Sequence, residues 1–146
     1  MSAGPAGKLY SPELLSLATE LASYPLSDGL TLRQEERSRT CGSTIVLGLS
    51  TAGGGMVDAV GMQVSACAVG QASAAIMARG IVGSAPHTVI ETYEQILHWL
   101  AGEGALPQWP GFTALEAARD YAGRHGALLL PWKAAAEALS KVTPTS

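Results

Sequence analysis

The chain contains two cysteines, Cys41 and Cys67, and both lie in a stretch that is almost free of charge. Asp58 is the only charged residue between Arg39 and Arg79. A stretch of this kind packs against other parts of a fold, so we expect both thiols at the edge of one core. Cysteine thiolates bind metals and act as nucleophiles, whereas many free cysteines are simply small buried apolar side chains. The pair therefore indicates either a thiolate site or two inert thiols.

Cys67 stands where a helix is expected to begin, because Ala68, Ala72 and Ala75 follow it at helical spacing. The unpaired N–H groups and the dipole at a helix start lower the pKa of a thiol. We therefore expect a thiolate at Cys67. One hypothesis from this pattern is a thiol function, in which Cys67 accepts a persulfide and Cys41 resolves it as a reversible disulfide.

A metal site needs more donors than two thiols. A structural zinc ion or an iron-sulfur cluster takes four protein donors, or three and an open position. His125 is the nearest further candidate in the sequence, since imidazole binds both zinc and iron, although an ordinary surface histidine is the simpler interpretation. A two-fold homodimer is a second route to four donors, with two cysteines from each copy.

The sequences around both cysteines resemble the U-type iron-sulfur cluster assembly scaffolds, the family of IscU, SufU and the amino-terminal part of NifU. Residues 41–43, Cys-Gly-Ser, are similar to the family's Cys-Gly-Asp, and residues 66–75 are similar to its Gly-Cys-Ala-Ile-Ser-x-Ala-Ser-Ala-Ser pattern. Arg124 and Trp132 match the family's Arg-x-x-Cys-Ala-x-Leu-Ala-Trp element. The resemblance covers nearly the whole chain.

Two departures fall on positions that the family uses for metal. Ala127 aligns with its third cysteine, and Ser43 aligns with the aspartate of Cys-Gly-Asp. The resemblance implies a scaffold or carrier, not an enzyme, that receives sulfur from a cysteine desulfurase and holds an iron-sulfur cluster or iron through Cys41 and Cys67. Zinc is the alternative metal. The other alternative is a metal-free paralogue that docks on the desulfurase or another assembly partner and modulates it.

Composition limits the other classes of function. The 146 residues suit one domain, 47% of them are hydrophobic, and the nine basic residues are scattered in a chain of net charge -3. No basic face for nucleic acid is expected. The uncharged run 59–78 contains too many polar residues and glycines to span a membrane, and the start of the chain does not read as a signal peptide. We therefore expect the cytoplasm and reduced thiols.

The hydrophobic pattern predicts an α+β fold, with a three-stranded antiparallel meander packed against four to five helices. Ile45, Leu47 and Leu49 share one face of the clearest strand. A single domain is expected over 9–141, between disordered tails at 1–8 and 142–146. Strands are predicted near 30–37, 44–50 and 56–64, and helices over 11–24, from 67 to about 80, 84–102, 113–121 and through 132–139.

Overall fold

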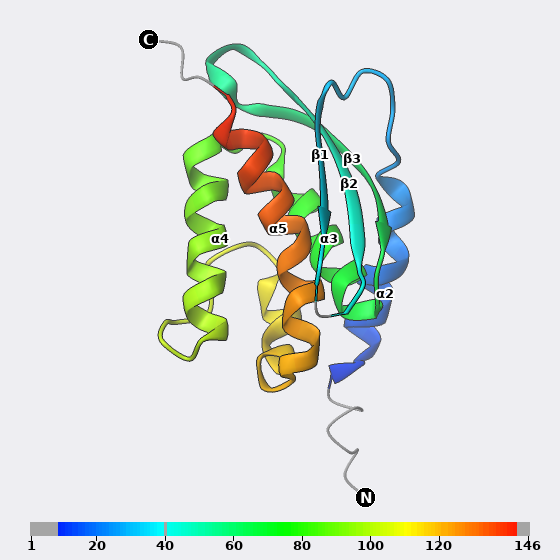
Figure 1. The fold of residues 1–146 in the computed structure, drawn as a ribbon, viewed down its shortest axis with the longest axis vertical. Helices are drawn as coiled ribbons and strands as arrows, with labels where there is room; N and C mark the ends of the chain where they lie inside the picture. Colours follow the sequence, from blue (N-terminus) through cyan, green and yellow to red (C-terminus); the bar gives the residue numbers. More distant parts are fainter. Residues whose placement is uncertain (1–8, 40, 143–146) are drawn as a thin grey trace, which may run out of the picture.

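A computed structural model of the chain describes residues 9–39 and 41–142, and it confirms the predicted α+β class (Figure 1). One antiparallel sheet packs against helices from both halves of the chain. The strands are β1 (Leu32–Arg37), β2 (Thr44–Thr51) and β3 (Val57–Ser65), and the α-helices are α2 (Pro12–Glu20), α3 (Ala68–Ile81), α4 (Pro86–Leu100) and α5 (His125–Ser140). Shorter 3-10 helices are η1 (Leu21–Ser23), η2 (Gly53–Gly55), η3 (Phe112–Asp120) and η4 (Ala122–Arg124).

The expected tails lie almost entirely outside the described residues. Of the segments 1–8 and 142–146, only Val142 is described, and it packs half-buried against the core. Within the described ranges, no helix combines the length and the apolar character needed to cross a bilayer.

The sheet is the predicted meander, in the order β1-β2-β3. Alternate residues of β2 point into the core, and Ile45, Leu47 and Leu49 are buried, as a period of two requires. On β3 their partners are Val64, Met62 and Val60. Helix α5 packs against β1 and β2, and α3 packs against β3, so these two helices cover the apolar face of the sheet.

The other face carries a pair of glycines that admit the loop after α2. Gly48 on β2 and Gly61 on β3 are direct partners. A Cβ atom on Gly61 would lie 2.2 Å from the carbonyl oxygen of Pro25, and one on Gly48 would lie 2.9 Å from the Cβ of Leu30. Because neither glycine has a side chain, the loop that leads into β1 lies directly on the sheet.

Helix α3 lies at the centre of the fold and is buried on most of its surface. It contacts α2, α5, β3 and η3. The Ser73 hydroxyl donates to the carbonyl of Leu128 at 2.7 Å and accepts a hydrogen bond from Trp132 Nε1 at 2.9 Å, all within the core. The Trp132 and Trp109 rings pack edge to face, with 4.8 Å between their centroids. These contacts fix α3 on α5.

Three details differ from the predicted elements. Helix α5 begins at His125, well before Trp132, because burial of neighbours such as Leu128 and Leu130 outweighs the hydrogen bond that Pro131 cannot donate. The segment predicted as a short helix over 113–121 is the 3-10 helix η3. Gly80 does not end α3 but lies inside it, where a Cβ would meet the Trp109 ring at 2.8 Å.

Replacement of Ser73 by alanine tests the α3–α5 contact. The variant leaves the buried Trp132 N–H without an acceptor, so we expect the free energy of unfolding to fall by about 1–3 kcal/mol, measured by urea denaturation. Ser16→Ala, on the exposed side of α2, is the matched control and should change stability by about 0.5 kcal/mol or less. Equal stabilities of the two variants would contradict this assignment.

Candidate functional site

Cys41 lies at the tip of the hairpin that joins β1 to β2. The Ser38 N–H donates to the Ser43 carbonyl at 2.8 Å, and the Gly42 N–H donates to the Ser38 carbonyl at 3.1 Å. Gly42 has a φ angle of 74°, in the left-handed region that glycine adopts without strain. This closed turn presents the Cys41 side chain on the surface, where it is exposed.

Cys67 lies where β3 gives way to α3. It occupies the position just before the first helical residue, and its carbonyl accepts the N–H of Gln71 at 3.0 Å. The Gln71 side chain in turn donates to the carbonyl of Ala66 at 3.1 Å, which ties the approach segment to the first turn. The helix therefore begins where the sequence predicts, and the Cys67 side chain is partly exposed.

The two thiols line a single cavity of about 290 Å³, at the end of the sheet where the hairpin and the start of α3 meet. They converge because the first residue of β2, Thr44, pairs with the last residue of β3, Ser65. The expectation that both cysteines lie near each other is thus confirmed. The cavity lining consists of Cys41, Gly42, Ser43, Ser65, Ala66, Cys67, Gly123 and Arg124.

Hydroxyl groups and a guanidinium lower the pKa of the Cys41 thiol. Its Sγ lies 3.3 Å from the Ser38 Oγ and 3.0 Å from the Ser43 Oγ, and these two hydrogen bonds are the main causes. The positive charge of Arg124 acts in the same direction. Arg124 is itself held by the Tyr10 hydroxyl, which accepts from its Nε at 3.1 Å. Because the thiolate is the metal ligand and the nucleophile, these neighbours favour the reactive form.

His125 lies outside the lining of this cavity. Its Nε2 is 2.7 Å from the carbonyl oxygen of Arg119, which lies in η3. Ala127 is 1% exposed and offers no donor atom. Across residues 9–39 and 41–142, no three side chains of histidine, cysteine, aspartate or glutamate gather closely enough to hold a metal ion. One chain thus supplies two thiols to the site.

Sequence reasoning identified both cysteines but missed two residues that support them. Ser38 stands three positions before Cys41, and only the closed hairpin turn brings its hydroxyl to the sulfur. Tyr10 is 114 positions from Arg124, and no local pattern signals their contact. Arg124 was recognised only as part of the family element, and its place beside the thiols comes from the fold.

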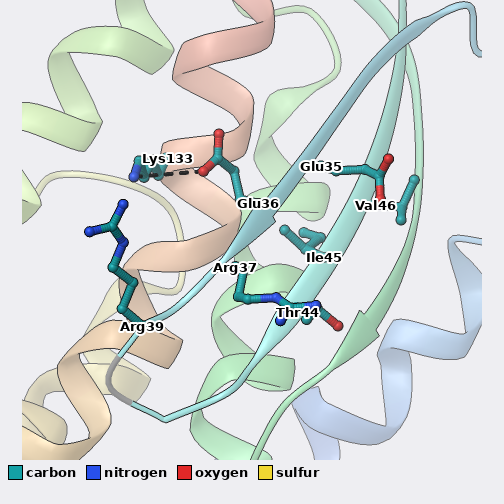
Figure 2. Close-up of a pocket in the computed structure, with 8 residues that line it drawn as sticks. All are labelled: Glu35, Glu36, Arg37, Arg39, Thr44, Ile45, Val46 and Lys133. Carbon is teal, nitrogen blue, oxygen red and sulfur yellow. Dashed lines mark ion pairs between the residues drawn. The ribbon is translucent and has the colours of Figure 1, made fainter.

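A larger cavity of about 550 Å³ adjoins the hairpin, along β1 and α5 (Figure 2). Its charged residues are of both signs. Lys133 on α5 lies 3.6 Å from the Glu36 carboxylate, whereas Arg37, Arg39 and Glu35 are exposed. Besides these five, Thr44, Ile45 and Val46 line this groove, which contains neither a thiol nor an imidazole. We call it the charged groove.

The hydroxyl of Ser43 can be tested through the reactivity of Cys41. Ser43→Ala removes one of the two main hydrogen bonds to the sulfur, so the pKa of Cys41 should rise and its alkylation at neutral pH should slow. Alkylation rates across a pH series, read by mass spectrometry at Cys41, measure the shift. Ser65→Ala changes a serine of the same cavity that makes no hydrogen bond to Cys41. This variant should leave the pH dependence of Cys41 alkylation unchanged. Identical profiles for Ser43→Ala and the wild-type chain would contradict this cause.

Comparison with known proteins finds chains that are similar to this one over most of its length. The "Iron-sulfur cluster assembly scaffold protein IscU" of Thermotoga maritima is 27% identical over 139 residues, which cover 92% of this chain and 95% of the relative. The crystal structure of a nitrogen-fixing NifU-like protein (amino-terminal) from Brucella abortus has a TM-score of 0.82 at 27% identity, over 94% of this chain and 96% of that one. No protein-family model matches the chain.

A putative iron-sulfur cluster assembly scaffold protein for the SUF system, from Fervidobacterium islandicum, has a TM-score of 0.81 at 21% identity, and it covers 90% of this chain and 96% of its own. At 21% identity, this similarity supports the fold alone. The matches to the first two proteins extend over 92% and 94% of this chain. Over nearly its full length, this chain is therefore similar in sequence and fold to an IscU iron-sulfur cluster assembly scaffold and to the amino-terminal part of a NifU-like protein.

Proposed function

We propose that this chain is an iron-sulfur cluster assembly scaffold that holds iron or a cluster, as cargo, through the thiolates of Cys41 and Cys67. The observation that carries the proposal is their convergence: segments 26 positions apart bring both thiols to one cavity beside Arg124. The relatives that match over their full length are named as scaffolds for this assembly. Thiolate sulfur is the ligand that iron-sulfur clusters use.

Three residues of the cavity have distinct parts in this function. Cys41 is exposed and its pKa is lowered, so it is the thiolate that an incoming donor meets first. The guanidinium of Arg124 offsets the negative charge that builds up when thiolates and sulfide gather. Ser43, which stands where the family has an aspartate, supports Cys41 through its hydroxyl and is a poor metal ligand.

The family's scaffolds are carriers, so no catalytic residue is assigned. We propose that sulfur reaches the site from a cysteine desulfurase, which hands over sulfane sulfur as a persulfide to an accessible thiolate. The exposed hairpin tip makes Cys41 the accessible acceptor. Reduced thiols are needed for this transfer, which is consistent with the predicted cytoplasmic location.

The test is the metal content of protein purified without oxygen. We expect iron and acid-labile sulfide to bind to the wild-type chain on reconstitution, and each of Cys41→Ser and Cys67→Ser to lose most of both, because a single remaining thiolate cannot hold the cargo. Zinc is measured in the same samples. Zinc retained in place of iron would change the metal but keep the site.

His125→Ala is the matched control. It removes an imidazole, a group of a type that can bind metal, from a position that does not line the cavity. It should retain the iron and sulfide of the wild-type chain. A wild-type chain that binds no metal, even after reconstitution, would contradict the proposal and leave the docking function, without metal, as the account of the chain.

A further inference from the structure

One chain brings fewer donors to the thiol cavity than an iron-sulfur cluster takes. Cys41 and Cys67 line this cavity, and no third histidine, cysteine, aspartate or glutamate of residues 9–39 and 41–142 joins them. The positions outside these ranges contain none of the four residue types. A cluster takes four ligands, as a rule thiolates, so further sulfur has to enter from outside. The rim of the cavity is open to such a ligand, because Cys41, Gly42 and Gly123 are exposed.

The charged groove opens beside this rim, on the same hairpin. Thr44 lines the groove while its neighbour Ser43 lines the cavity, and Arg39 of the groove stands two positions before Cys41. An extended tripeptide is about 10 Å long, so a molecule of that size can lie in the groove and place a thiol at the cavity. The groove volume of about 550 Å³ is that of a small-molecule site.

Basic side chains predominate where the groove and the cavity meet, although the chain has a net charge of -3. Two acidic side chains line the two hollows, against four basic ones, Arg37, Arg39, Arg124 and Lys133. Glu36 lies 3.6 Å from Lys133, whereas Arg39 is exposed and makes no ion pair with any residue of the described ranges. Figure 2 shows Arg39 and Lys133 on the α5 side of β1, and Glu35 on the other side. An anion that enters on the α5 side therefore meets two cations and one carboxylate.

We propose that the charged groove binds a small anionic thiol, whose thiolate joins Cys41 and Cys67 as a ligand of the iron. Its carboxylate pairs with the guanidinium of Arg39, a group whose planar fork matches a carboxylate. The thiol releases its proton to solvent as the iron–sulfur bond forms, so the step is a ligand exchange that needs neither oxidant nor reductant. The proposal rests on the scaffold function above and adds a second binding site and the class of its ligand.

Reconstitution with matched thiols tests the ligand. The wild-type chain is loaded anaerobically with iron and sulfide in glutathione, in glutathione dimethyl ester, which has the same thiol but no carboxylate, or in a phosphine alone. We expect half-maximal loading at an about tenfold lower concentration of glutathione than of its ester, and at least one glutathione bound per cluster after gel filtration. Equal requirements for the two thiols, or a cluster without bound glutathione, would overturn the groove site and leave the scaffold function. No iron or sulfide under any condition would overturn both.

S-methylglutathione provides a second measurement that is independent of iron. It keeps both carboxylates, but its methylated sulfur cannot act as a thiolate. We expect it to shift the backbone amide NMR signals of Arg39 and Thr44 in the metal-free chain and to inhibit glutathione-dependent loading. Arg39→Glu should abolish both effects, and Arg119→Glu, at an exposed arginine outside the groove, is the matched control that should retain them. Unshifted signals in the wild-type chain, or shifts that persist in Arg39→Glu, would overturn the site.

Discussion

The close approach of α3 to α5 is the constraint on which the site depends. Near its start, α3 has Gly70 where any side chain would collide with Ala66 and crowd Ala127 on α5. One turn further on, Ser73 bonds to α5 through the Leu128 carbonyl and the Trp132 ring nitrogen. Because the two helices touch at these small residues, the segments that carry Cys67 and Arg124 share one cavity. A larger residue at the contact would separate them.

The same packing determines which atoms can act as ligands. Ala127 on α5 is buried and offers no donor atom to the thiols. Donors are confined to the rim, where the turn around Gly42 presents Cys41. The Ser38 and Ser43 hydroxyls and the Arg124 guanidinium then favour the thiolate of Cys41. The fold thus concentrates reactivity at its open edge.

The hydrophobic periodicity of the sequence predicted the strands and the start of the helix that position the two cysteines. The alternation of Ile45, Leu47 and Leu49 gave the central strand, and the change to helical spacing after Cys67 gave the start of α3. Contacts between distant segments were beyond such patterns. The Tyr10–Arg124 hydrogen bond and the loop laid over Gly61 arise from tertiary packing, and a single sequence contains no signal for either. The early start of α5 at His125 was also missed, because burial keeps the helix intact across Pro131.

The most direct test of this account is the position of iron in crystals of the anaerobically loaded chain, located by anomalous scattering at the iron absorption edge. The account predicts iron bonded to the Sγ atoms of both Cys41 and Cys67, in the cavity beside Arg124. Iron bound at a histidine away from this cavity, or bonded to neither thiol, would contradict it.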